Sequence, residues 1–308
     1  MAGVTDASYR QIIKRVAPET VVYTEFLSTN AISFGSARTM KMLDFDPSIE
    51  RPFIVQIFGS DPQKFLEACK IIEQMGADGI DINMGCPAAK IVSSCYGSAL
   101  MRNPKLAAEL VASAVKTVKI PVSVKTRLGW DDKDKLISFC KGLEEAGAAA
   151  FAIHGRRYCD KFTGEADWEP IYALKREVNV PVLGNGDIGS GADALRRIGN
   201  LDGVMVGRST FGNPWVMQEV IQALQTGKAD QKRELSSDEK LGVFRDRVPF
   251  ILEHCELSVR HKGERRGVLE MRRHFGGYIK GFDGAKELRM KLMAIENLAE
   301  VTSTLQTV

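Results

Sequence analysis

A cysteine stands directly after one of the apolar runs of this sequence. The stretch GADGIDINMGCPAAK (76–90) places Cys86 between Gly85 and Pro87, at the end of a run, 79–84, that predicts a buried strand. A free cysteine in such a place can be core filling or the reactive group of an enzyme. Its position alone does not separate the two interpretations.

Polar side chains follow most of the other apolar runs as well. They are Gln56, Asn83, Lys125, Arg127, His154, Arg156, Asn185, Asp187 and Arg208. Because an unpaired buried ammonium costs several kcal/mol, we expect Lys125 to face a ligand or a carboxylate. For His154 a structural role and a ligand-binding role both stay open, because Gly155 and Arg156 follow it on the same predicted rim.

Two glycine-rich segments predict a phosphate-binding site. They are VLGNGDIGSG (182–191) and VMVGRSTFGNPW (204–215), and each contains the end of a predicted strand. Exposed backbone N–H groups in such turns favour an anion, and Arg208 could add a charge-assisted hydrogen bond. The glycines could also merely permit tight turns, but two such segments late in the chain favour a phosphorylated ligand.

Short β-rich runs alternate with amphipathic helical segments over most of the chain. The expected strands are 21–27, 53–58, 79–84, 122–126, 149–153, 180–183 and 203–206, and the helices between them include 62–75, 104–118, 134–146, 170–177 and 192–198. This repeat predicts a parallel sheet with helices outside it. Since polar residues follow successive strands, we favour an α/β fold of the (β/α)8 TIM-barrel type over an open sheet.

The first strand of this barrel is expected to be truncated or missing. The sequence opens with MAGVTD (1–6), which resembles the turn after a strand, and a helix is predicted from 8 to 16. Seven strands are therefore visible where a closed barrel needs eight. An absent first strand would leave exposed edges beside the gap.

A change of composition after Gly227 divides the chain into two predicted domains. The polar stretch 228–240 contains Ser236, a residue suited to begin a helix, and the rest of the chain has helical patterns without strand candidates. We therefore expect a barrel domain over 1–235 and an all-α helical bundle over 236–308.

Composition narrows the class of protein. The chain of 308 residues is 44% apolar. No segment approaches the roughly 20 apolar residues of a membrane helix, and no signal segment is recognisable at the start. We therefore expect a cytoplasmic monomer that does not contact a membrane. The six cysteines lack the CxxC spacing of a zinc site, which predicts reduced thiols and no metal.

The C-terminal segment 258–291 is strongly basic. It carries ten Lys or Arg residues against four Asp or Glu residues, although the net charge of the chain is only +3. A charge run is usually only a solvated face, but basic and aromatic residues also alternate here, as they do on nucleic-acid-binding surfaces. The alternating residues are Arg272, Arg273, His274, Tyr278 and Lys280.

Eight motifs together resemble the tRNA-dihydrouridine synthase family. They are MAGVTD, VQIFG, DINMGCPAAKI, YGSALM, VKTRLGW, IHGR with FTGEADWEPI, GNGDI and GRSTFGNPW, in the order and at the spacing of the family. The HGR and GEADW signatures resemble its bacterial branch. The resemblance covers the whole chain and implies that a segment is missing ahead of it.

The resemblance implies a flavoenzyme that reduces the C5=C6 bond of uracil in tRNA. The cofactor would be FMN, with NADPH or NADH as the reductant, and the helical domain would help to hold tRNA. Lys125 would stabilise the reduced, anionic flavin. The implied FMN-binding residues are Met1, Ala2, Gln56, Lys125, His154, Asn185, Gly186, Asp187, Gly207 and Arg208.

The resemblance also gives Cys86 a task, which is to protonate C5 of uracil from the face opposite to the flavin. A thiol that is largely protonated at neutral pH suits this task. The family pattern does not require a cysteine at the position of Cys95, the rival thiol. The implied substrate-binding residues are Asn83, Arg127, Arg272, Arg273 and Lys280.

Two other functions remain open. Another FMN barrel oxidoreductase, such as a dihydroorotate-type dehydrogenase acting on a small cyclic substrate, would explain Cys86, Lys125 and the phosphate site but not the basic tail. An RNA-binding barrel that has lost catalysis would fit a missing first strand. Bound flavin would exclude this last function, and salt-sensitive tRNA binding would exclude the dehydrogenase.

Overall fold

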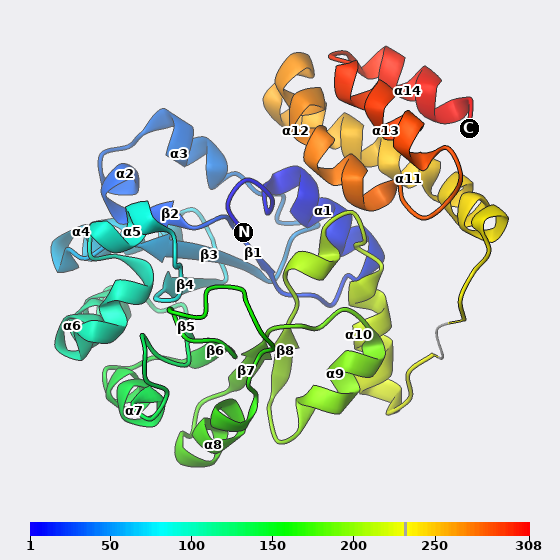
Figure 1. Ribbon diagram of the computed structural model, residues 1–308. Helices are drawn as coiled ribbons and strands as arrows, with labels where there is room; N and C mark the ends of the chain where they lie inside the picture. Colours follow the sequence, from blue (N-terminus) through cyan, green and yellow to red (C-terminus); the bar gives the residue numbers. More distant parts are fainter. Residues whose placement is uncertain (231–232) are drawn as a thin grey trace.

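Parallel strands form a curved sheet in the N-terminal part of the chain (Figure 1). In the computed structural model, which describes residues 1–230 and 233–308, the strands are β1 (Val22–Tyr23), β2 (Leu27–Ser28), β3 (Phe53–Phe58), β4 (Gly79–Asn83), β5 (Val122–Arg127), β6 (Ala150–His154), β7 (Val182–Asn185) and β8 (Gly203–Met205). Their order is β1-β3-β4-β5-β6-β7-β8, with β2 also paired to β3, and every pair is parallel. Within the described ranges no ladder joins β8 to β1, so the barrel stays open there.

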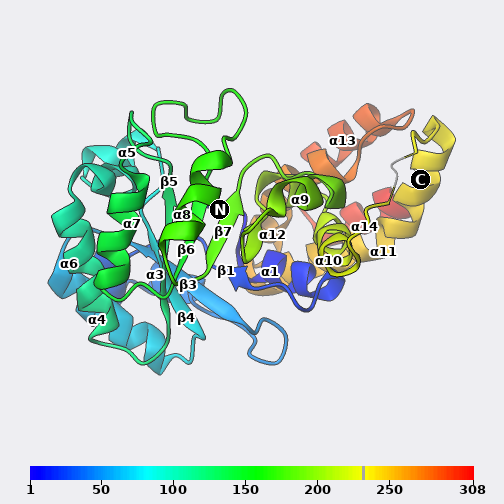
Figure 2. The same cartoon turned by 90° about the horizontal axis from the view of Figure 1, so that it is seen from below.

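Helices cover the outer face of this sheet (Figure 2). They are α1 (Ala7–Val16), α4 (Pro62–Gln74), α6 (Pro104–Val115), α7 (Leu136–Glu145), α8 (Glu169–Glu177), α9 (Gly191–Ile198) and α10 (Val216–Thr226). Shorter helices lie in the loops: α2 (Thr29–Ser33), α3 (Ala37–Met42), α5 (Ala89–Ser93) and the 3₁₀ turns η1 (Gly97–Arg102) and η2 (Arg208–Thr210). Strand residues such as Ile57, Ile80 and Phe151 are fully buried, as expected for a parallel sheet covered by helices. The predicted barrel fold is therefore confirmed.

The predicted strand 21–27 is wrong in one respect, because it is split into β1 and β2. Thr24 still belongs to the sheet, since its N–H donates to the carbonyl of Ile54 (3.0 Å) and its hydroxyl accepts from the N–H of Gln56 (3.0 Å). Glu25 then turns its carboxylate to the N–H of Gly3. This contact with the start of the chain interrupts the ladder, and no local sequence pattern reports it.

Four helices form the C-terminal domain: α11 (Ser237–Lys262), α12 (Glu264–Tyr278), α13 (Ala285–Ala294) and α14 (Leu298–Gln306). Helix α11 starts with a capping box, in which Ser236 and Glu239 accept each other's backbone N–H. The helices bury an apolar core of their own that includes Ile251, Phe275 and Val301. The all-α fold of this domain is confirmed, while its boundary at 235/236 stays a prediction.

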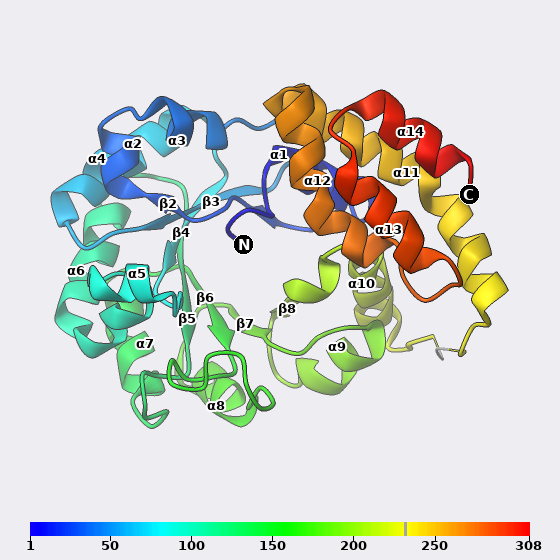
Figure 3. The same cartoon turned by 45° about the horizontal axis from the view of Figure 1, so that its top comes forward.

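The helical domain packs against α1 and the start of the chain, beside the barrel (Figure 3). The Tyr9 hydroxyl donates to the carbonyl of Thr210 (2.6 Å), and its ring stacks on His274 at 5.2 Å. Lys262 Nζ lies 2.5 Å from a carboxylate oxygen of Asp6. Burial would raise the pKa of Asp6, but Lys262 outweighs burial and lowers that pKa to about 2. An ionised pair therefore joins the two domains at neutral pH.

Three expectations from composition concern the whole chain. None of the helices in residues 1–230 and 233–308 combines the length and apolar character that a bilayer span requires. All six cysteines are free thiols. The same residues contain no group of three or more His, Cys, Asp or Glu side chains arranged to hold a metal ion.

Candidate active site

The polar residues that follow the apolar runs meet along the carboxyl ends of β3 to β7. Asn83 pairs with Lys125 across the β4–β5 ladder, Arg127 pairs with His154 across β5–β6, and His154 pairs with Asn185 across β6–β7. Adjacent strands therefore bring polar side chains together at the mouth of the barrel. The sequence prediction that these residues share one rim is confirmed.

A buried chain of hydrogen bonds leads to the turn that carries Cys86. Asp81 accepts from the Ser123 hydroxyl (2.7 Å) and from the Gln56 amide (2.7 Å), and the Gln56 oxygen accepts from Asn83 Nδ2 (3.0 Å). The Asn83 Oδ1 atom in turn accepts from the backbone N–H of Cys86 (2.9 Å). Asp81 was absent from the predicted site, although a carboxylate inside an apolar strand was a usable signal.

Cys86 itself is half-buried and is held from two sides. Its carbonyl accepts from the Ser98 hydroxyl (2.9 Å) and N–H (3.2 Å). A Cβ atom at Gly85 would lie 3.2 Å from the Thr126 carbonyl carbon, so the chain passes β5 closely. The backbone of Cys86 is therefore fixed just beyond the end of β4. Cys95 is exposed and has φ 60°, a left-handed conformation that residues other than glycine rarely adopt.

Lys125 lies deep in the mouth, where its Nζ donates to Asn185 Oδ1 (3.0 Å). Burial lowers the pKa of Lys125 to about 8, against the attraction of Asp81. Burial also raises the pKa of Asp81 to about 6, against its hydrogen bonds from Ser123 and Gln56 and the attraction of Lys125. At neutral pH both groups are charged, and the charge of Asp81 favours the protonated form of Lys125, although the Lys125 ammonium is hydrogen-bonded to Asn185.

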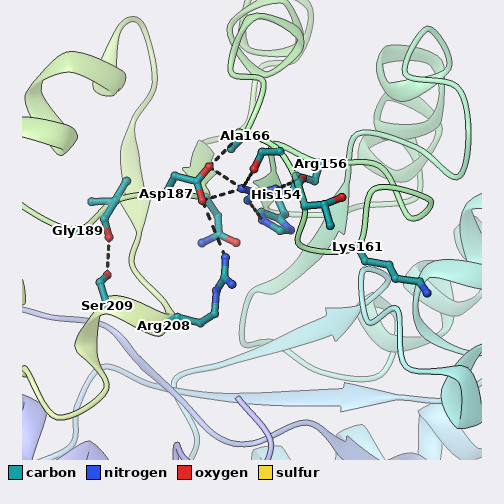
Figure 4. A network of polar contacts seen from close by, with 12 residues as sticks. His154, Arg156, Lys161, Ala166, Asp187, Gly189, Arg208 and Ser209 are labelled. Carbon is teal, nitrogen blue, oxygen red and sulfur yellow. Dashed lines mark hydrogen bonds and ion pairs between the residues drawn. The ribbon is translucent and has the colours of Figure 1, made fainter. Parts of the chain in front are cut away.

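A second network lies on the β6–β8 side of the mouth (Figure 4). Arg156 Nη2 donates to both carboxylate oxygens of Asp187 (2.9 and 2.7 Å), and the Ala166 N–H donates to the same carboxylate (2.7 Å). Arg156 Nη1 lies 3.3 Å from His154 Nε2, and the exposed Arg208 lies 3.9 Å from Asp187. Burial and the surrounding cations lower the pKa of His154 to about 2, so the imidazole is neutral.

The glycine turns of this network offer uncommitted donors. The backbone N–H groups of Gly186, Asp187 and Gly207 find no acceptor in the described part of the chain. A Cβ atom at Gly186, which has φ 127°, would lie 2.7 Å from Ala166 Cβ, so this tight turn requires glycine. A Cβ atom at Gly207 would lie 3.9 Å from the Met1 sulfur, which places Met1 beside this turn. Ala2 is exposed.

Arg127 is committed to the backbone rather than open to a ligand. Its side chain is 2% exposed and donates to the carbonyls of Gly85 (2.8 Å), Arg157 (3.1 Å) and Lys161 (2.8 Å). It therefore braces the cysteine turn against the loop that follows β6. The sequence offered no sign of these three acceptors.

The predicted basic and aromatic surface of the tail is partly wrong. His274 and Tyr278 are buried, because they face Tyr9 and His254 at the junction of the two domains. Arg272 is half-buried and donates to the carbonyl of Ile295 (3.3 Å). Of the predicted set, only Arg273 and Lys280 are exposed, and Arg273 also donates to the carbonyl of Gly3.

The known proteins that are similar to this chain include several tRNA-dihydrouridine synthases. The family model described as dihydrouridine synthase (Dus) matches residues 1–308. A probable tRNA-dihydrouridine synthase of Rickettsia bellii is 38% identical over 94% of this chain and 86% of the relative. The tRNA-dihydrouridine synthase B of Pseudomonas aeruginosa is 36% identical over 96% and 87%. The probable tRNA-dihydrouridine synthase 1 of Synechocystis is 36% identical over 97% and 82%. The chain therefore belongs to the dihydrouridine synthase family.

Proposed function

We propose that this protein reduces the C5=C6 bond of uridines in tRNA to give 5,6-dihydrouridine. The names of its relatives support the reaction and the substrate. The observation that carries the proposal is the placement of Cys86, which is half-buried and whose backbone is held by Asn83 and Ser98 at the mouth of the barrel. Uncommitted backbone donors and the exposed Arg208 lie at the same mouth, where a phosphorylated cofactor can bind.

The residues of the mouth fit FMN. Lys125 offers a half-buried cation, which suits the electron-poor edge of a flavin, and the N–H groups of Gly186, Asp187 and Gly207 suit its phosphate. Asp187 would contribute through its backbone, since Arg156 engages its side chain. The other residues that would hold FMN are Met1, Ala2, Gln56, His154, Asn185 and Arg208. When bound, FMN supplies the hydride that C6 of uracil receives, and NADPH or NADH restores the reduced cofactor.

Cys86 donates the proton that C5 of uracil receives. Its S–H bond breaks as the new C–H bond forms, and the proton together with the hydride completes the saturated ring. Arg127 holds the turn that carries Cys86 through its hydrogen bond to the Gly85 carbonyl (2.8 Å). Asn83 keeps one amide hydrogen beyond its bond to Gln56, and this donor can hold an acceptor on the uracil edge.

Exposed cations of the helical domain would bind the phosphate backbone of tRNA. Arg273 and Lys280 are the exposed members of the predicted set. Arg273 contacts the start of the chain, so the same helix reaches from the tail toward the mouth. Arg272 supports α12 through its bond to Ile295 and contributes mainly through its charge.

Reconstitution tests the proposed function. The purified protein is loaded with FMN and incubated with NADPH or NADH and tRNA transcribed without modifications. We expect dihydrouridine in nuclease digests analysed by mass spectrometry, and salt-sensitive binding of the tRNA. Oxidation of dihydroorotate with no change in tRNA would instead identify a small-molecule dehydrogenase. RNA binding by a protein that takes up no flavin would also overturn the proposal.

A further inference from the structure

Three aromatic rings line the β2–β4 side of the mouth, close to Cys86. The rings of Phe26 and Phe58 meet edge to face at 5.3 Å and 77°, and those of Phe58 and Tyr96 at 5.6 Å and 60°. All three are half-buried. Phe58 is the last residue of β3, two residues after Gln56, so both side chains leave the strand on the same face. We refer to Phe26, Phe58 and Tyr96 as the aromatic wall.

The aromatic wall is tied to the cysteine turn through Tyr96. The two residues after Tyr96 pack on Cys86, since Ser98 donates to the Cys86 carbonyl and a Cβ atom at Gly97 would lie 3.2 Å from Cys86 Cβ. Both neighbours of Tyr96 have left-handed backbone conformations, with φ 60° at Cys95 and 58° at Gly97. A non-glycine residue such as Cys95 rarely adopts this conformation, so the two neighbours mark a tight turn around Tyr96, whose own backbone is extended.

The hydroxyl of Tyr96 has no hydrogen-bond partner in the described part of the chain. The Tyr96 hydroxyl makes no hydrogen bond to residues 1–230 or 233–308, whereas Tyr172 on the barrel exterior donates to the carbonyl of Arg197 (2.8 Å). The aromatic wall also carries no charged member. The cations Lys125, Arg156 and Arg208 come instead from β5 and from the turns that follow β6 and β8. The wall thus offers π-faces and a free hydroxyl rather than an anion site.

We propose that the aromatic wall binds the nucleobase adjacent to the target uridine. The inference rests on the proposed function and adds to it a second subsite for the RNA strand. Enzymes that act on a single base take it out of its stack, which leaves the neighbouring base without a partner. Aromatic side chains are the usual replacement partner for an unstacked base in RNA. The wall lies beside the proton donor, where that neighbour must enter.

Substitutions at Tyr96 test the proposal through binding rather than turnover. The probe is a short single-stranded oligouridylate that carries one 2-aminopurine base, whose fluorescence changes when it stacks. We expect Tyr96→Leu to weaken binding about tenfold, which is within the usual contribution of one stacked base. Tyr96→Phe should keep most of the affinity, and Tyr96→Trp should bind at least as tightly as the wild type. Equal affinity of all four proteins would overturn the proposal.

Two controls separate stacking from a general structural effect. Tyr172→Leu removes a half-buried tyrosine from the outside of the barrel and should leave probe affinity unchanged. Phe58→Leu removes a second ring of the wall and should weaken binding in the same direction as Tyr96→Leu. A loss of affinity in Tyr172→Leu as large as that in Tyr96→Leu would count against the proposal.

The same measurements distinguish this proposal from the proposed function. If wild-type protein forms dihydrouridine in tRNA while Tyr96→Leu has an unchanged KM for tRNA, the aromatic wall is not a subsite and the proposed function stands. If the wild type neither binds the probe nor modifies tRNA, the proposed function itself fails. A raised KM with an unchanged single-turnover rate at saturating tRNA supports the subsite.

Discussion

The two sides of the barrel mouth hold their polar groups in opposite ways. On the β3–β4 side, Gln56 and Asn83 are amides that are buried, neutral and bonded to each other, and Gln56 also donates to the buried Asp81. On the β6–β8 side, the glycine turns keep free backbone donors. There Arg208 is largely exposed. Delivery of a proton requires one fixed atom, whereas binding of an anion requires donors that are still uncommitted.

Lys125 joins the two sides. Its ammonium donates to Asn185 on β7, and its charge lies within the field of Asp81 on β4. Because burial lowers its pKa only to about 8, Lys125 is charged at neutral pH. We therefore expect that substitutions on the β3–β4 side lower the rate of the reaction. Substitutions on the β6–β8 side should instead lower the affinity for the cofactor.

Removal of the Cys86 thiol should affect the chemistry of the β3–β4 side without affecting the cofactor site of the β6–β8 side. We expect Cys86→Ala to lower the rate of dihydrouridine formation by about 10²- to 10⁴-fold, the usual contribution of a general acid, without loss of FMN. Single-turnover assays on tRNA and flavin absorbance measure the two effects. Cys95→Ala is the matched control, since it removes the exposed neighbouring thiol. A wild-type rate in Cys86→Ala would show that the β3–β4 side does not supply the proton through Cys86 as proposed.

Asn83→Ala tests whether the buried amides position the thiol. The substitution leaves the N–H groups of Gly85 and Cys86 without their acceptor, which should cost about 2 kcal/mol of unfolding free energy. It should also lower turnover roughly tenfold or more, because a displaced donor is a poor catalyst. Asn103→Ala removes a comparable acceptor at the start of α6 and should lower stability alone. Equal turnover in both variants would contradict the positioning role.

Much of the difference between the two sides of the barrel mouth could be predicted from the sequence. The strand 53–58 was predicted with its observed bounds, and the row of polar residues along β3 to β7 follows from the rule that parallel strands end on one face. The separate roles of Arg127 and Asp187 could not be predicted. Both side chains bond to loop atoms far along the chain, and only the folded loop brings those atoms together.

The error in the tail has a different origin. A helical pattern predicts that α12 has an apolar face, but a histidine or tyrosine can lie on either face. His274 is buried because Tyr9 and Phe211 of the barrel stack on its ring. Sequence periodicity describes one helix at a time, so it could not report a partner that arrives from another domain.

Arg208→Gln tests the β6–β8 side on its own. Loss of this exposed guanidinium should weaken FMN binding about tenfold, as expected for one charge-assisted hydrogen bond, and should leave the affinity for riboflavin unchanged. Fluorescence titration of flavin-free protein with both ligands measures the difference. Turnover at saturating FMN should stay close to that of the wild type. An equal loss for FMN and riboflavin would place Arg208 away from the phosphate.

The smallest predicted effect concerns His154, because it bears on stability rather than on binding. Its pKa is near 6.5 when the chain is unfolded and about 2 when folded, so between these values the unfolded chain binds one more proton. Stability is therefore lost as the pH falls below about 6.5. In His154→Gln, which keeps an acceptor for Arg156, flavin-free protein should lose about 1 kcal/mol less than the wild type between about pH 7 and pH 5.5. Urea denaturation at the two pH values measures this difference. Identical losses would mean that His154 takes up its proton in the folded protein as readily as in the unfolded chain, and at pH 5.5 the neutral acceptor for Arg156 would then be absent from the β6–β8 side.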